Sequence, residues 1–181
     1  MSIQHVIGDL LTSDCNYICH QVNCQGKMNS GIAKSIREKW PVVYHNYMSK
    51  YDAISDLAVE TSNGYENLDV SKILLGDIQL VGLWDDYYTI DFHQTVINMF
   101  SQEHYGYDGR RYTSYDAFWN CLNLIKNAIP KGSKVGFPGY IGCVRGGANW
   151  NVIKSMIEEV LAQDFEVYIY YLKGENDNAV D

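Results

Sequence analysis

The chain has 181 residues, of which 46% are hydrophobic, and a formal net charge of −8 at pH 7. A chain of this length suits one domain and buries enough surface to fold without disulfides or metal ions. Nonspecific nucleic-acid binding requires Lys and Arg to neutralise phosphates, and 14 basic residues against 22 acidic ones exclude it.

The cysteines and the chain start give no sign of secretion or metal binding. The five cysteines form no CxxC pair and match no zinc-ligand spacing, so we expect reduced thiols, no metal and no cofactor. The first residues, MSIQHVIGDLL, lack a basic region followed by a long apolar run, and no segment approaches about 18 apolar residues. The sequence therefore predicts a cytoplasmic protein with no membrane partner.

Seven short apolar segments are predicted to be strands, and several are continuous runs, as in strands covered on both faces. Helices are predicted at Gly31–Trp40, at 42–51, and after N-caps at Thr113 and Asn149. This alternation predicts a three-layer α/β/α domain with a mixed, mainly parallel sheet of about six strands. The strand segments are 3–8, 17–23, 56–60, 78–84, 95–100, 134–138 and 165–171.

Two glycine-containing loops each follow a predicted strand and precede a helix, at 24–30 and 139–148. Glycine lets the backbone approach a ligand closely, and a helix N-terminus offers unpaired N–H groups and a partial positive charge. Because ligands lie beyond the carboxyl ends of strands in such sheets, the two loops together predict a diphosphate site. The alternative is a pair of flexible connections. Neither loop is a P-loop or a GxGxxG fingerprint.

Asp9 follows Gly8 at the end of the first predicted strand. A carboxylate at this position can accept a hydrogen bond from an exocyclic amine such as that of adenine. The alternative is that Asp9 caps a following turn.

These elements, in this order, resemble the macro domain family. The matching stretches are GDLL at 8–11, HQVNCQGKMNSGIA at 20–33, NMFSQ at 98–102 and GFPGYIGCVRGGANWNVI at 136–153. The resemblance implies a macro domain over 1–173 and a polar tail over 174–181. Macro domains bind ADP-ribose, and many hydrolyse bonds at its distal ribose. The implied ligands are ADP-ribose or ADP-ribose 1''-phosphate, with ADP-ribosylated macromolecules as further partners.

The resemblance also implies a role for individual residues. Asp9 would bind the adenine amine with Leu10 behind the ring, and Asn23 would bind the distal ribose hydroxyls. Tyr170 or Tyr171 would stack near the adenine. The phosphate loops would be formed by backbone N–H groups of Asn29, Ser30, Gly31 and Ile32, and of Gly142, Cys143, Val144, Arg145, Gly146 and Gly147.

His20 stands where many macro domains have asparagine, and it resembles the branch that includes ADP-ribose 1''-phosphate phosphatases. Imidazole titrates near pH 6.5 and can transfer protons at neutral pH. His20 and Asn23 are therefore the predicted catalytic residues, and removal of the terminal phosphate is the first-choice activity. The alternative for His20 is a structural hydrogen bond. Its expected acid partner comes from Asp85, Asp86 or Asp91.

Two other functions stay open. An ADP-ribosyl glycohydrolase would release ADP-ribose from modified protein or nucleic acid; one branch uses a lysine and an aspartate, where this chain has Ser101 or Gln102 and Gly146. A non-catalytic ADP-ribose reader is the third possibility. Arg110 and Arg111 would contact a terminal phosphate, or else belong to a solvated turn.

Overall fold

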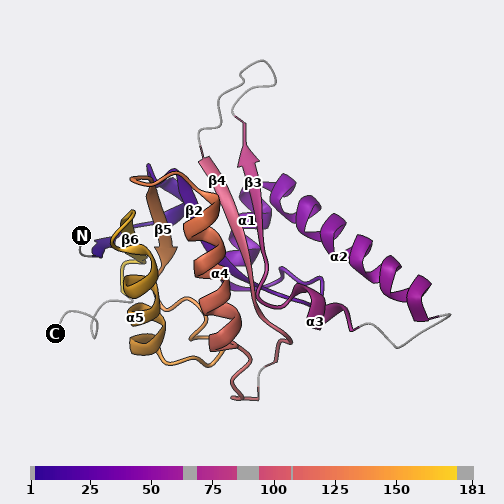
Figure 1. The fold of residues 1–181 in the computed structure, drawn as a ribbon. Coiled ribbons are helices and arrows are strands. Elements are labelled where there is room, and N and C mark those ends of the chain that lie inside the picture. The colour runs from indigo at the N-terminus through magenta and orange to yellow at the C-terminus, as the bar shows by residue number, and fades with distance from the viewer. Residues whose placement is uncertain (1–2, 63–68, 85–93, 107, 175–181) are drawn as a thin grey trace.

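The computed structural model describes residues 3–62, 69–84, 94–106 and 108–174. Its described strands form one sheet in the order β1-β6-β5-β2-β4-β3 (Figure 1). Every neighbouring pair is parallel except β3 and β4, so the expected mixed, mainly parallel sheet is confirmed. The strands are β1 (Gln4–Ile7), β2 (Tyr17–Asn23), β3 (Ile78–Leu83), β4 (Gln94–Gln102), β5 (Lys134–Pro138) and β6 (Glu166–Tyr171).

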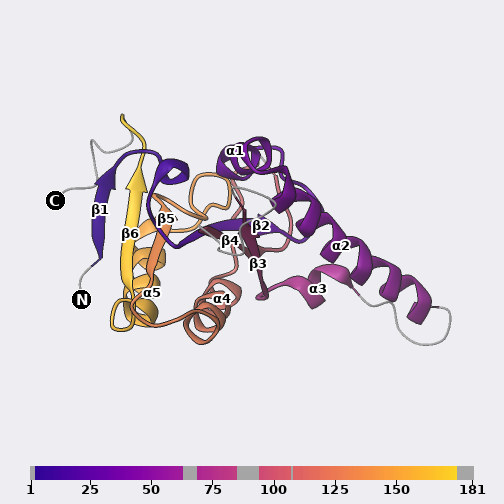
Figure 2. The same ribbon diagram turned by 90° about the horizontal axis from the view of Figure 1, so that it is seen from above.

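Helices cover both faces of this sheet. Seen from above, α1 (Gly31–Lys39) and α2 (Pro41–Ser62) lie on one side, and α4 (Tyr115–Ala128) and α5 (Trp150–Leu161) lie on the other (Figure 2). The short elements are η1 (Leu10–Thr12) and α3 (Val70–Leu74). The predicted three-layer α/β/α architecture is therefore confirmed. None of the helices in the described ranges combines the length and apolar character that a bilayer crossing requires.

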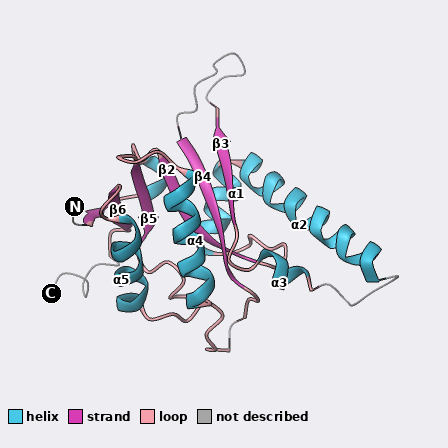
Figure 3. Ribbon diagram, in the orientation of Figure 1, coloured by secondary structure: helices cyan, strands magenta, loops and turns pink. Residues whose placement is uncertain are grey.

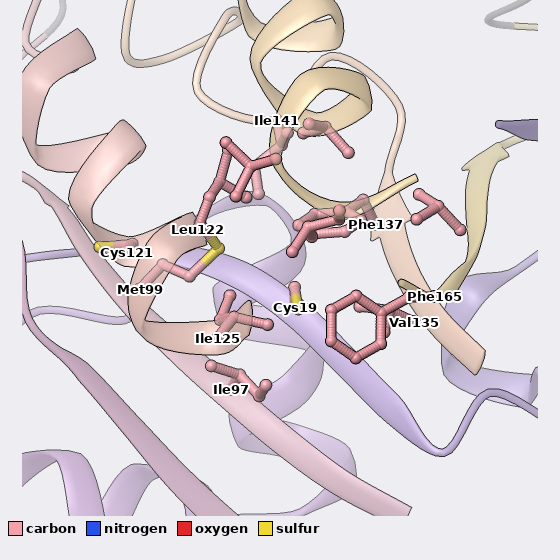
Figure 4. Close-up of a cluster of buried hydrophobic side chains, with 14 of the residues drawn as sticks. Cys19, Ile97, Met99, Cys121, Leu122, Ile125, Val135, Phe137, Ile141 and Phe165 are labelled. Atoms are coloured by element: carbon pink, nitrogen blue, oxygen red, sulfur yellow. The ribbon is translucent and has the colours of Figure 1, made fainter. Parts of the chain in front are cut away.

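Two hydrophobic clusters hold the layers together, one on each face of the sheet. Along β2, Cys19 packs toward α4 and α5, while Ile18 and Val22 pack toward α1 and α2. Figure 4 shows the first cluster, in which Leu122 of α4 lies near Met99 of β4. Because central strands are buried on both faces, their sequences read as continuous apolar runs rather than alternations.

The predicted strand at 56–60 is wrong, because these residues belong to α2 (Figure 3). The helix continues through them since the inward-facing positions Tyr47, Tyr51, Ile54 and Ala58 keep the spacing of three and four residues that marks one helical face. The alternation of apolar and polar residues at 56–60 spans five residues only, so the longer apolar face of the helix determines the structure here.

Two N-cap residues were predicted, and one of them is wrong. Asn149 caps α5 through its side chain, as expected. The N-cap of α4 is Ser114, whose Oγ accepts from the N–H of Ala117 at 3.2 Å. The neighbouring Thr113 uses its hydroxyl elsewhere. Apart from Gly174, the predicted tail lies outside the described residues.

Candidate ligand-binding site

Five strand ends meet at one rim of the sheet. Because β1, β6, β5, β2 and β4 are mutually parallel, their carboxyl ends lie on the same side. A pocket of about 700 Å³ opens there, and its walls come from the segments that follow each of these strands. The two glycine-containing loops therefore share one rim, as the sequence predicted.

The first loop leads into α1 with an uncapped helix start. Ser30 is the N-cap residue, but its side chain makes no capping hydrogen bond. The first N–H groups of an α-helix have no acceptor within the helix, and Ser30, Gly31, Ile32 and Ala33 all line the pocket. Asn29 lines it too, while its Oδ1 accepts from Arg37 at 2.7 Å. This helix end offers backbone donors and a partial positive charge to an anion.

The second loop contributes Gly142, Val144, Arg145 and Gly146 to the pocket wall. None of the hydrogen bonds between described residues uses the N–H of Val144 or Gly146. These two amides are thus donors that the loop itself does not consume.

Cys143 and Gly147 depart from the expected phosphate-binding role. Neither lines the pocket, and their N–H groups donate within the loop, to Tyr140 O and Cys143 O, each at 2.9 Å. Burial raises the pKa of the Cys143 thiol to about 11 and keeps it protonated at neutral pH. Both residues therefore build the loop, and their amides do not point free into the pocket.

Asn23 lines the pocket, but its side chain already organises the turn that follows β2. Its Oδ1 accepts from the N–H groups of Gln25 and Lys27 and from the hydroxyl of Tyr47, at 3.0, 3.3 and 3.0 Å. Its Nδ2 donates to the carbonyl of Lys27 at 2.7 Å. A ribose hydroxyl would therefore meet the remaining Nδ2 hydrogen, because Oδ1 already accepts three hydrogen bonds within the fold.

Tyr47 ties this turn to α2, and removing its hydroxyl is expected to destabilise the protein. Tyr47 is fully buried, and its hydroxyl shares its hydrogen between Asn23 O, at 2.8 Å, and Asn23 Oδ1 while it accepts from Lys27 N at 3.0 Å. Tyr47→Phe is expected to lower the free energy of unfolding by about 1–2 kcal/mol, because these groups lose a buried partner. Urea unfolding measures this, with Tyr44→Phe as control, since Tyr44 contacts Tyr47 through its ring and its hydroxyl makes no hydrogen bond to a described residue. Equal losses in both variants would contradict the assignment.

The residues at the end of β1 belong both to a turn and to the pocket wall. Asp9 caps η1 by accepting the N–H of Leu11 on Oδ1 at 2.9 Å, and it also lines the pocket beside Leu10. Its second oxygen makes no hydrogen bond to any residue in the described ranges. Of the two tyrosines considered for adenine stacking, Tyr170 lines the pocket, whereas Tyr171 is buried and its hydroxyl bonds to His5 at 3.1 Å.

His20 does not reach the pocket, contrary to the expectation that it projects toward the ligand. The side chain is fully buried on the face of β2 that also carries Ile18 and Val22. Its Nε2 donates to Asn98 Oδ1 at 2.5 Å, because Asn98 uses its Nδ2 to donate to Gln79 at 3.0 Å. Nδ1 has no partner among the described residues. Burial lowers the pKa of His20 to about 4, so the imidazole is neutral at pH 7.

The three aspartates expected beside His20 and the two arginines expected at a terminal phosphate have different outcomes. Asp85, Asp86 and Asp91 lie outside the described residues, and the flanking pair Leu83 and Gln94 lies at the rim opposite the pocket. Arg110 pairs with Asp108 at 3.2 Å, and Arg111 lies over the ring of Tyr115 at 4.5 Å. Neither arginine lines the pocket. The structure favours the solvated-turn interpretation for both.

Several pocket residues were missed by the sequence analysis, namely Gln21, Tyr105 and Tyr140. Gln21 could have been found, because a strand period of two places it on the face of Asn23 and away from His20. Tyr105 and Tyr140 lie in irregular loops, where the sequence has no repeat from which the orientation of a side chain can be predicted. Tyr140 adopts a φ of 57°, an unusual value for a residue with a side chain.

The charges of the pocket favour an anionic ligand. Among the described lining residues, Asp9 is the single carboxylate, whereas Lys27 and Arg145 are cations. Within the described part of the chain, no group of three or more His, Cys, Asp or Glu residues gathers as a metal site. The chemistry available at the rim is therefore backbone donation, two cations and one carboxylate at the β1 end.

The sheet order, the two helical layers and the rim pocket define a three-layer α/β/α domain with a pocket at the carboxyl ends of its parallel strands. No known protein-family model matches the sequence, and no curated protein matches it significantly. Solved structures do match. A protein of unknown function from Bacteroides thetaiotaomicron superposes with a TM-score of 0.72 at 24% identity, over 95% of this chain and 99% of its own.

Two further matches are macrodomain structures. The macrodomain of Mycobacterium tuberculosis DarG has a TM-score of 0.66 at 20% identity, over 93% of this chain and 97% of its own. Thermosipho africanus DarTG in complex with ADP-ribose has a TM-score of 0.68 at 19% identity, over 96% of this chain and 42% of its own. At these identities the likeness concerns the fold, and the chain has the macrodomain fold.

Proposed function

We propose that this protein binds ADP-ribose or a close derivative in the rim pocket. The observation that carries the proposal is the pair of amide sets that face one pocket, at the start of α1 and in the loop of Val144 and Gly146. Backbone donors at a helix N-terminus bind phosphate without side-chain charge. A pyrophosphate fits such a pair, and Asp9 at the β1 end supplies an acceptor for the adenine amine.

The neighbouring structures support the same ligand. Thermosipho africanus DarTG and the Trypanosoma brucei macrodomain were both solved in complex with ADP-ribose. The pocket volume of about 700 Å³ is also in the range that encloses a ligand of this size.

Hydrolysis at the distal ribose is the second candidate function. The first-choice reaction is removal of the terminal phosphate from ADP-ribose 1''-phosphate. The alternative is ADP-ribosyl glycohydrolase activity, which releases ADP-ribose from modified protein or nucleic acid. The pocket extends beyond the phosphate loops to Gln21, Gln102 and Tyr105, which leaves a polar end for a substituent on that ribose. No described carboxylate lines this end, and His20 lies outside it. Turnover would thus rely on a positioned water and on the substrate's own phosphate, so simple binding is the better-supported function.

One set of assays separates these functions. Calorimetry with ADP-ribose tests binding, while incubation with ADP-ribose 1''-phosphate and with ADP-ribosylated protein and DNA tests release of phosphate or ADP-ribose. Binding without release supports the ADP-ribose reader. Phosphate release identifies the phosphatase, and ADP-ribose release identifies the glycohydrolase. Absence of ADP-ribose binding would refute the proposal as a whole.

Asp9→Asn is expected to weaken ADP-ribose binding by about tenfold, because the carboxamide can present an N–H where the adenine amine needs an acceptor. Asn also caps helices well, so the η1 turn is preserved. The matched control is Asp14→Asn, which makes the same change at an exposed ion pair with Lys134 away from the pocket. Calorimetry measures both, and an unchanged affinity in Asp9→Asn would remove Asp9 from the adenine site.

A further inference from the structure

Thr113, which precedes α4 and does not line the pocket, holds the second phosphate loop together from behind. Its side chain is almost completely buried, at 1% exposure. Its hydroxyl donates to the carbonyl of Gly142 at 2.8 Å and accepts from Nε2 of Gln21 at 2.9 Å. The hydroxyl thus joins β2 to the first residue of the loop turn.

The backbone N–H groups at Thr113 and its neighbour bind the other end of the same loop. The N–H groups of Tyr112 and Thr113 both donate to the carbonyl of Gly146, at 2.8 and 3.0 Å. The carbonyls of residues 142 and 146, on either side of Val144, are therefore both hydrogen-bonded to Thr113. Together with the N–H of Tyr112, Thr113 fixes the part of the loop that carries the Val144 and Gly146 amides.

Three loop glycines pack closely against Thr113 and the residues before it. A Cβ at Gly142 would lie 2.5 Å from Oε1 of Gln21 and 3.1 Å from Oγ1 of Thr113. A Cβ at Gly146 would collide with the same Oγ1. At Gly147, a Cβ would lie 2.9 Å from the carbonyl oxygen of Arg110. The loop is packed against 110–113 along its length.

Gln21 completes the arrangement with both amide hydrogens engaged. Its Nε2 donates to Thr113 Oγ1 and, at 3.1 Å, to Oε1 of Gln102. Gln102 in turn donates to the carbonyl of His104 at 2.7 Å and forms a backbone bridge with Thr113. The ends of β2 and β4 are thus connected to the second loop through Gln21 and the buried hydroxyl of Thr113.

The geometry points to Thr113 as a positioning residue for the ligand's phosphates, acting through the loop and not by contact. This inference rests on the proposed ADP-ribose function and adds the residue that preorganises one half of the pyrophosphate site. Because these donors are already held in place before binding, no free energy of binding is lost in ordering the loop.

Thr113→Val tests the inference because it removes the hydroxyl and keeps the shape. We expect ADP-ribose to bind about tenfold more weakly by calorimetry. Adenosine, which has no phosphate, is expected to bind equally to both proteins in an NMR titration. Thr113→Ser keeps the hydroxyl and should restore the affinity for ADP-ribose. Parallel losses for both ligands would mean general damage and would overturn the inference.

A second comparison applies if Thr113→Val does not fold. Thr113→Ser and Thr113→Ala both lack the methyl group and differ in the hydroxyl, so Ser should bind ADP-ribose about tenfold more tightly than Ala. Equal affinities would overturn the role of Thr113 while leaving the proposed function intact. Failure of the unaltered protein to bind ADP-ribose would instead overturn the proposed function, and the inference with it.

Discussion

Gly31→Glu is expected to weaken ADP-ribose binding on the order of 100-fold, because a carboxylate at the start of α1 competes for the same amides and repels the phosphates. Gly31 lines the pocket, has a φ of 55°, and has no described atom within 4 Å of an added Cβ. The new side chain therefore has space to occupy the position that an anionic ligand requires.

Gly132→Glu is the matched control for this change. Gly132 also has a positive φ, 81°, and open space around an added Cβ, but it lies in the turn before β5, at the opposite rim. Both variants carry a similar backbone strain of about 1–2 kcal/mol. Calorimetry with ADP-ribose and urea unfolding should show similar losses of stability and a loss of affinity in Gly31→Glu alone. Retained affinity there would place the phosphates away from α1.

The second large effect concerns stability and pH, and it arises from His20. Its pKa in the folded protein is lowered to about 4 by burial, whereas an unfolded chain titrates histidine near 6.5. Between these values the unfolded state binds more protons, so stability rises with pH in this window. The contribution of neutral His20 to the free energy of unfolding is fully present above about pH 6.5, and roughly 3 kcal/mol of it is lost as the pH falls to about 4.

His20→Gln removes this titration and keeps a polar side chain beside Asn98. Urea unfolding of both proteins between pH 7.5 and 4 should therefore show a difference in stability that shifts by roughly 3 kcal/mol in favour of the variant at low pH. The carboxylates and the other histidines are common to both proteins and cancel. Parallel pH profiles would show that His20 is not buried and neutral. The variant should also bind ADP-ribose as tightly as the unaltered protein, since His20 does not line the pocket.

The sequence by itself determined the layers of the fold and the place of the pocket. Continuous apolar strands separated by striped helices can be buried only in a sheet covered on both faces. Parallel strands bring their carboxyl ends to one rim, so Asp9, Gly31 and Gly146 had to share it. Local patterns also placed the cap of α5, because an asparagine side chain before an apolar stripe satisfies N–H groups that a helix cannot.

Only the tertiary structure decided which of these groups are free for a ligand. Asn23, Cys143 and Gly147 have the expected residue types, but their polar atoms are used within the loops to which they belong. His20 faces the α1 and α2 layer and pairs with Asn98, a residue 78 positions away in the chain. Thr113 reaches the second loop in the same way, across 29 positions. A hydrogen bond between distant residues depends on strand order and register, and no local pattern in the sequence contains either.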